Sequence, residues 1–165
     1  MQANLKSRFF YIIIAGLVLF SDRISKFAIS SKFDLGQPVP VIDGLFNITY
    51  VQNTGVAFGI FSSISSPVKS VLLSVFTAFA AIVVITYSVR SPVRNRLLQV
   101  ALALILGGAL GNLYDRLAYG YVVDFLEVYW RAYHWPSFNV ADSAISIGVL
   151  LLAIEIIRNE TPHRA

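Results

Sequence analysis

The run SVLLSVFTAFAAIVVITYSV, residues 70–89, contains no charged side chain. A helix needs about 20 apolar residues to cross the hydrocarbon core of a bilayer, and this run has that length. We therefore predict that residues 70–89 form a transmembrane helix, which makes the bilayer the solvent for this part of the chain.

Three further apolar stretches have a similar length and cover residues 9–29, 97–117 and 138–157. The chain of 165 residues is 56% hydrophobic and only 13% charged, which is outside the usual range for a water-soluble domain. We predict one all-α polytopic membrane domain, residues 1–165, with four transmembrane helices. A cleaved signal peptide is the alternative for the first stretch, but Asp22, Arg23 and Lys26 continue its helical pattern and three more stretches follow.

Basic residues indicate how these helices are oriented. They precede the first stretch, fill the connection between the second and third, and follow the fourth: Lys6, Arg8, Arg90, Arg94, Arg96, Arg158 and Arg164. By the positive-inside rule, both termini and the middle connection lie in the cytoplasm. Residues 30–69 and 118–137 then lie outside.

The two outer segments differ in pattern. Residues 45–51 are rich in β-formers and follow turn residues at Pro40 and Gly44. We predict a small extracytoplasmic β-sheet at about residues 38–60. The second outer segment carries aromatic residues typical of a membrane-interface belt, namely Tyr129, Trp130, Tyr133 and Trp135.

Composition excludes several kinds of chemistry. The chain has no cysteine, so it has no disulfide, no thiolate nucleophile and no Cys-ligated metal. Two histidines, His134 and His163, are too few for a His-rich metal site, although a carboxylate-bound metal stays open. No basic stripe interleaved with aromatic residues indicates nucleic acid as a partner.

Polar residues of three predicted helices converge on one depth. Asn112 and Asp142 each lie about 24 Å of helix rise from a cytoplasmic arginine, and Asp22 lies about 21 Å from one, at 1.5 Å per residue. Polar and ionisable groups just beneath the outer surface are costly unless they are paired or functional. Asp22 and Lys26 share a helix face at i,i+4, as do Asn112 and Arg116. This convergence predicts a site.

The third stretch carries two further features. Asp115 is placed to pair with Arg116 or to receive Lys26 from a neighbouring helix. Gly107 and Gly111 form a small-xxx-small step that lets another backbone approach closely, which we interpret as packing.

Five motifs in this order resemble those of the lipoprotein signal peptidases, also called signal peptidase II. They are Asp22-Arg-Ile-Ser-Lys26, Asn53-Thr-Gly-Val-Ala-Phe58, Gly107-Gly-Ala-Leu-Gly-Asn-Leu-Tyr-Asp-Arg116, Val122-Val-Asp-Phe125 and Phe138-Asn-Val-Ala-Asp142. The resemblance covers the chain from about Phe9 to Arg158. Each motif alone is weak, but five in sequence with this topology are specific.

The resemblance implies an enzyme of the bacterial inner membrane. Such an enzyme removes signal peptides from prolipoproteins after a diacylglyceryl group has been attached to the cysteine that becomes residue one. It implies that Asp124 and Asp142 are the catalytic aspartates, that Asn112 and Arg116 help to hold substrate, and that the outer sheet cradles the lipoprotein segment. The peptide antibiotic globomycin blocks members of this family. We expect a monomer surrounded by membrane lipid, with no cofactor, no metal and no nucleic acid.

Two carboxylates can hydrolyse a peptide bond if they share one proton, because like charges a few ångströms apart do not both ionise easily. The ionised member of Asp124 and Asp142 would take a proton from water, and the protonated member would hydrogen-bond the scissile carbonyl. Which aspartate carries the proton stays open, since a coupled pair titrates as a unit.

Several residues are expected to support this pair. We expect Asp115 to orient Arg116, and Asn139 to orient the carboxylate one helical turn later, at Asp142. Asn53 contributes from the outer segment. Asp22 and Lys26 are interpreted first as a structural pair that secures the first helix near the site.

Other interpretations stay open at this point. Taken singly, Asp142 fits a helix N-terminal residue favoured by the macrodipole, and Asp124 fits a solvated loop carboxylate. A small proton-coupled transporter or channel would also carry intramembrane carboxylates, but it needs polar groups through the whole depth, and the inner helix halves are almost purely apolar. Lys26 and Ser30, at i,i+4, suggest a Ser/Lys hydrolase.

Overall fold

The computed structural model describes residues 2–55 and 66–160. The described residues form four helices and four strands. The helices are α1 (Gln2–Lys32), α2 (Ser66–Arg90), α3 (Arg96–Tyr119) and α4 (Val140–Glu160). The strands are β1 (Val39–Ile42), β2 (Phe46–Asn53), β3 (Val122–Trp130) and β4 (Tyr133–His134).

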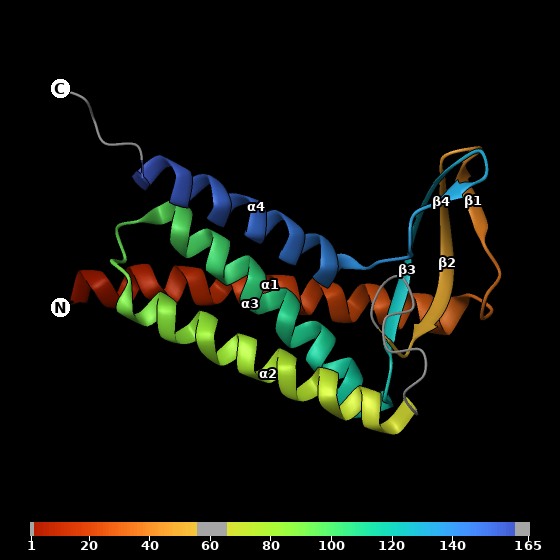
Figure 1. Ribbon diagram of the computed structural model, residues 1–165, viewed down its shortest axis with the longest axis horizontal. Helices are drawn as coiled ribbons and strands as arrows, with labels where there is room; N and C mark the ends of the chain where they lie inside the picture. Colours follow the sequence, from red (N-terminus) through yellow and green to blue (C-terminus); the bar gives the residue numbers. More distant parts are fainter. Residues whose placement is uncertain (1, 56–65, 161–165) are drawn as a thin grey trace.

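The four helices run side by side, and the sheet lies across one end of them (Figure 1). Helix α3 packs against α1, α2 and α4, whereas α2, over the described residues, packs on α3 alone. The start of α1, the end of α4 and the connection between α2 and α3 all lie at the end opposite the sheet (Figure 1). The basic connection between α2 and α3 and the sheet therefore lie at opposite ends of the helices (Figure 1).

Three helices are long and apolar enough to cross a membrane, over Val68–Arg90, Arg96–Tyr119 and Val140–Arg158. They confirm the helices predicted at 70–89, 97–117 and 138–157. Large apolar side chains on α2 point outward, with Phe76 71% and Phe79 63% exposed. Since a water-soluble domain rarely exposes such a continuous apolar face, the surrounding solvent is lipid.

Strands β1 to β4 form one antiparallel sheet in sequence order. Strands β1 and β2 confirm the sheet predicted near residues 38–60, of which residues 56–60 lie outside the described residues. Strand β3, which contains Asp124, was not predicted from the sequence, and its end was interpreted only as an aromatic belt. Valine, tyrosine and tryptophan favour strands as well as membrane interfaces, so composition did not separate the two.

The sheet is fixed to the helices through a small apolar cluster. Ile48 and Tyr50 of β2 pack against Ile29, Val123 and Phe125, which join the end of α1 to β3. The pairing of β2 with β3 shifts register between Ile48 and Val51, where Val51 lies opposite Asp124. Such irregularities re-aim side chains, and this one lies beside a predicted catalytic residue.

Glycines of α3 allow close helix contacts. A Cβ atom on Gly107 would lie 2.6 Å from the carbonyl oxygen of Ala15 on α1, and one on Gly111 would lie 2.6 Å from Oδ2 of Asp22. Gly108, between them, faces the carbonyl oxygen of Ala141 on α4. The predicted packing role of the Gly107–Gly111 step is confirmed, because α1 and α4 approach α3 where it has no side chains.

Candidate active site

Asp124 lies on β3 and is 2% exposed. Its Oδ1 accepts a hydrogen bond from Nδ2 of Asn139 at 2.7 Å, and its Oδ2 accepts one from Nδ2 of Asn53 at 2.8 Å. The predicted contribution of Asn53 from the outer segment is therefore present in the geometry. Asp124 is a buried strand residue and not the solvated loop carboxylate of the alternative interpretation.

Asp142 lies in the first turn of α4 and forms a reciprocal cap with Asn139. The backbone N–H of Asp142 donates to Oδ1 of Asn139 at 2.9 Å, and the backbone N–H of Asn139 donates to Oδ2 of Asp142 at 3.2 Å. This is the capping-box pattern of a helix start. The other oxygen, Oδ1, accepts from Nδ2 of Asn112 at 2.7 Å. Asn139 therefore contacts Asp142 in the way its predicted orienting role requires, and Asp142 also fits the capping interpretation.

Asn139 joins the two aspartates. Its side-chain amide contacts Asp124, and its backbone amide contacts Asp142. Both carboxyl groups line one cavity of about 570 Å³. Other residues lining this cavity include Asn53, Gly55, Arg116, Trp135 and Phe138. The geometry therefore brings together two carboxyl groups that come from a strand and a helix.

Neutral amides hold all four oxygens of the pair. The pKa of Asp124 is raised from 3.8 to about 7, mainly by burial and secondly by the nearby charge of Asp142. Hydrogen bonds from Asn53 and Asn139 and the charge of Lys26 lower this pKa in part. A carboxyl group with a pKa near 7 exchanges its proton at neutral pH, as general acid–base catalysis requires.

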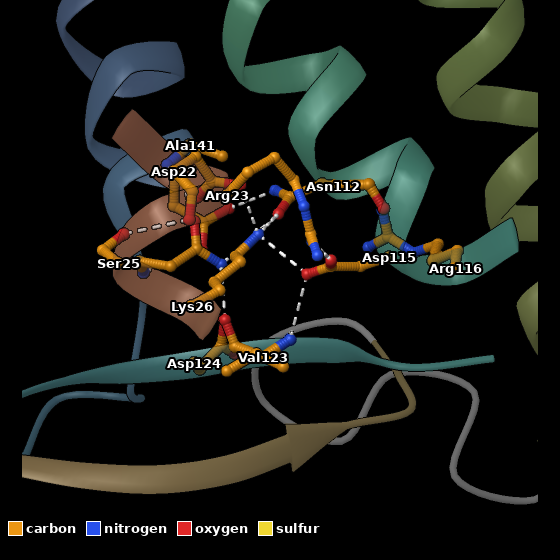
Figure 2. Close-up of polar contacts among 12 residues, drawn as sticks. Asp22, Arg23, Ser25, Lys26, Asn112, Asp115, Arg116, Val123, Asp124 and Ala141 are labelled. Carbon is orange, nitrogen blue, oxygen red and sulfur yellow. Dashed lines mark hydrogen bonds and ion pairs between the residues drawn. The ribbon is translucent and has the colours of Figure 1, made fainter. Parts of the chain in front are cut away.

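A buried ionic cluster has Lys26 at its centre (Figure 2) and is linked to Asp142 through Asn112. The Nζ atom of Lys26 lies 2.8 Å from Oδ2 of Asp22 and 2.9 Å from Oδ2 of Asp115. It also donates to Oδ1 of Asn112 at 3.0 Å. Asp22, Lys26 and Asp115 are each at most 1% exposed, so the predicted Asp22–Lys26 pair is confirmed as part of a larger cluster.

The cluster ties four elements together. Oδ1 of Asp22 on α1 accepts from the backbone N–H of Ala141 on α4 at 2.9 Å. Oδ2 of Asp115 on α3 accepts from the backbone N–H of Val123 on β3 at 3.2 Å. Gly120, with φ of 80°, ends α3 and turns the chain directly into β3. The backbone next to each aspartate of the pair is thus held by a buried carboxylate: Asp22 binds the backbone next to Asp142, and Asp115 binds the backbone next to Asp124.

Lys26 also determines how the Asn112 amide is oriented. Because Lys26 has only donors, the Asn112 oxygen must face it, which leaves the Asn112 nitrogen to donate to Asp142. Asn112 was expected to help hold substrate. Its side-chain amide contacts Lys26 and Asp142, so its geometry supports orienting a carboxylate.

Of the two partners predicted for Asp115, Lys26 is confirmed, whereas the described hydrogen bonds and ion pairs of Arg116 do not include Asp115, which therefore does not orient it. Asp115 forms ion pairs with Lys26 and Arg23, while Arg116 lines the cavity and donates to the carbonyl oxygen of Asn112 at 3.4 Å. Adjacent residues on a helix do not face each other, so the sequence neighbours Asp115 and Arg116 point apart.

Arg23 is a cluster member that the sequence analysis missed. Its guanidinium lies 4.2 Å from the centre of the Tyr114 ring and donates to Oη of Tyr119 at 3.3 Å. An arginine next to Asp22, at the depth of the other polar residues, needs a partner, and that requirement was the available signal. Among the described residues, no group of three or more His, Cys, Asp or Glu side chains could hold a metal ion.

Comparison with known proteins identifies the family. The family model described as signal peptidase (SPase) II matches residues 14–158. This chain belongs to the signal peptidase II family. It is 45% identical to the lipoprotein signal peptidase of Syntrophus aciditrophicus, over 91% of this chain and 93% of that one. It is 48% identical to that of Geobacter sulfurreducens, over 90% of this chain and 91% of the relative.

The fold agrees with this assignment. A solved bacterial membrane enzyme superimposes with a TM-score of 0.82 and 33% identity, covering 94% of this chain and 93% of the other. The signal peptidase II match runs through every helix and every strand described above. The protein is therefore an aspartic peptidase of the membrane, and the transporter and Ser/Lys hydrolase alternatives are not needed to explain its polar residues.

Proposed function

We propose that this signal peptidase II removes signal peptides from diacylglyceryl-modified prolipoproteins, with Asp124 and Asp142 hydrolysing the peptide bond through an activated water. The observation that carries the proposal is the pair of carboxyl groups that share Asn139 and face one cavity. Asp124 lies on strand β3 and Asp142 at the start of helix α4. An amide N–H donates a hydrogen bond to each of their four carboxylate oxygens.

The reaction needs one proton on the pair. The ionised carboxylate takes a proton from water, and the resulting hydroxide adds to the scissile carbonyl carbon. The protonated carboxyl group donates to the carbonyl oxygen, which gives a neutral tetrahedral diol. The carboxyl group that took its proton from water passes that proton to the peptide nitrogen. The carbon–nitrogen bond then breaks while one diol hydroxyl returns its proton to the pair, and the products are a carboxylic acid and an amine. The pair ends with one proton again and is ready for the next substrate.

The charged groups around the cavity suit a peptide substrate. Arg116 lines the cavity together with the two aspartates. Its guanidinium can donate to a backbone carbonyl of the substrate on the side away from the catalytic carboxylates. Trp135 and Phe138 add apolar surface to the same cavity. The β-sheet across the end of the helices would support the lipoprotein segment that follows the cleavage site.

We infer that all four helices span the bacterial inner membrane. Helix α1 has 31 residues, about 46 Å of rise, which exceeds the hydrocarbon thickness. Its charges at Asp22 and Lys26 are buried against α3 and α4, so they add little cost in lipid. Both termini lie in the cytoplasm, and the aspartate pair lies at the periplasmic side.

This placement explains a requirement for lipid on the substrate. Diacylglyceryl chains in the outer leaflet fix the modified cysteine at the depth of the aspartate pair. Holding a reacting group at a set position replaces much of the side-chain recognition that a soluble protease needs. The enzyme acts as a monomer under this proposal, and globomycin is expected to inhibit it at the same cavity.

The proposal is tested by purifying Asp124→Asn and Asp142→Asn and incubating each with a lipid-modified prolipoprotein. Both variants should lose cleavage by a factor of at least about 10³, as expected when a group that acts as acid or base is removed. Asp34→Asn and Asp43→Asn are matched controls, because both side chains are exposed and neither lines the cavity. Full turnover by either cavity variant would exclude the aspartate pair.

A further inference from the structure

A second cavity lies between α1 and α2, away from the aspartate pair. Both helices pack on α3, but over the described residues they do not pack on each other. The space between them is an apolar groove of about 430 Å³. Its lining includes Ile12, Gly16, Leu19, Ile85, Leu102 and Leu106. No residue lines both this groove and the active-site cavity.

The groove has the length of one membrane leaflet. Its lining on α1 runs from Arg8 to Leu19, which is about 16 Å of helix rise. Half of a hydrocarbon core of about 30 Å has nearly the same length. A helix, which is about 10–12 Å wide, would fill well over ~1,000 Å³ over that distance, so the groove is too small for one.

Gly16 shows that this space is open. No heavy atom lies within 4 Å of the position that a Cβ atom on Gly16 would occupy. Gly107, Gly108 and Gly111, by contrast, are pressed against neighbouring helices. A glycine in a helix interior costs stability relative to alanine, and at Gly16 no helix contact offsets that cost.

The groove is polar at one end only. Arg8 closes this end by donating to the carbonyl oxygens of Ser88 and Val89, each at 3.0 Å. Gln99 also lines it and donates to the carbonyl oxygen of Ser88 at 3.0 Å. An elongated apolar ligand with its polar group at this end therefore matches the groove.

Three arginines lie close in the chain to the residues that line this end of the groove, Ser88, Val89 and Gln99. Arg90 ends α2, Arg94 lies in the connection, and Arg96 begins α3. All three side chains are exposed, and among the described residues no acidic side chain pairs with them. Basic residues at a membrane surface attract anionic lipid headgroups, by about 1 kcal/mol each.

We propose that the groove binds one acyl chain of an anionic phospholipid of the cytoplasmic leaflet, with the lipid phosphate at Arg90, Arg94 and Arg96. The bound chain fills the space between α1 and α2 and joins two helices that otherwise meet only through long side chains. The leaflet assignment rests on the proposed topology, whereas the site itself rests on the groove and its charges.

The test uses native mass spectrometry of the purified full-length protein with phosphatidylglycerol and phosphatidylethanolamine of identical chains. The wild-type protein should retain phosphatidylglycerol in preference to phosphatidylethanolamine. Gly16→Leu should lose at least tenfold in retention of both lipids, because the leucine side chain occupies the groove. The triple variant Arg90→Gln/Arg94→Gln/Arg96→Gln should lose the preference for phosphatidylglycerol. At about 1 kcal/mol per arginine, the ratio of retained phosphatidylglycerol to phosphatidylethanolamine should fall about a hundredfold.

Ala153→Leu is the matched control for the groove, since Ala153 is exposed on α4 and does not line the groove. Peptidase activity of each variant reports on folding. If Gly16→Leu does not fold, Ile12→Trp fills the same groove from the neighbouring turn. Unchanged lipid retention by the groove variant that folds, or equal retention of both lipids by the wild type, would overturn the proposal. Displacement of bound phosphatidylglycerol by uncleaved prolipoprotein on Asp142→Asn would assign the groove to substrate instead.

Discussion

Replacing Asp124 by asparagine should make the folded protein more stable at neutral pH while removing its activity. The Asp124 carboxyl group is 2% exposed, and its pKa is about 7 in place of 3.8. A folded-state pKa above the unfolded value means that the folded protein holds this proton more tightly than the unfolded chain does. The associated stability is fully present below about pH 4 and is lost as the pH rises to about 7.

The size of this loss follows from the two pKa values. At about 1.4 kcal/mol for each unit of pKa, keeping Asp124 ionised in the folded protein above pH 7 costs on the order of 4 kcal/mol. Asparagine removes that cost, but it offers one oxygen where Asp124 offers two to Asn53 and Asn139. The lost hydrogen bond costs about 1–3 kcal/mol. We therefore expect Asp124→Asn to be more stable than the wild type by about 1–3 kcal/mol at pH 8, and less stable at pH 4.

Thermal unfolding of the purified protein in detergent, measured from pH 4 to pH 8, checks this expectation. The difference in Tm between Asp124→Asn and the wild type should change sign over this range. Infrared titration should show a carboxylic-acid C=O band that disappears near pH 7 in the wild type and is missing in the variant. Asp43→Asn, an exposed substitution, should track the wild type at every pH. A Tm difference that stays constant from pH 4 to pH 8 would refute the reasoning.

Three further predictions concern the same region. The kcat/KM of the wild type should fall as the pH rises through about 7, because Asp124 then loses the proton that the pair shares. A profile of kcat/KM that is flat up to about pH 9 would contradict this prediction. Lys26→Met should destabilise the protein by about 3–5 kcal/mol, since it leaves Asp22 as a buried charge without its cation and leaves Asp115 with Arg23 alone. Denaturant unfolding measures this loss, and Lys26→Met/Asp22→Asn should recover part of it. Gly111→Ala should reduce both stability and cleavage, because its Cβ would lie 2.6 Å from Oδ2 of Asp22; Gly16→Ala, in open space, is the control, and wild-type melting of Gly111→Ala would show that the contact can relax.

The parts of the fold that could be predicted depend on long-range spacing within one helix. A run of 20 uncharged residues such as 70–89 has few options besides crossing a bilayer. Rise per residue then sets the depth of Asn112 and Asp142, so their convergence could be inferred before any contact was known. The helix start at Asn139 was accessible in the same way, because capping residues act locally.

The parts that could not be predicted depend on contacts between elements. For Asp115 the sequence left Arg116 and Lys26 open as partners, and only the packing of α1 on α3 decides for Lys26 and adds Arg23. Which way the Asn112 amide points is set by Lys26, more than 80 residues away in the chain. Strand β3 was missed because its valine and aromatic residues suit an interface belt equally well.

The placement of Asn139 links folding and chemistry in this enzyme. Its side-chain oxygen caps α4, while its side-chain nitrogen donates to Asp124 on β3. Asp142 is both the acidic partner in that cap and the second carboxyl group of the pair. One side-chain amide thus makes both the cap of α4 and the contact with Asp124, so the local interaction that begins the helix also helps to assemble the site. A substitution that breaks this cap should reduce activity and helix stability together, whereas Arg116, which lines the cavity without capping a helix, should affect activity alone.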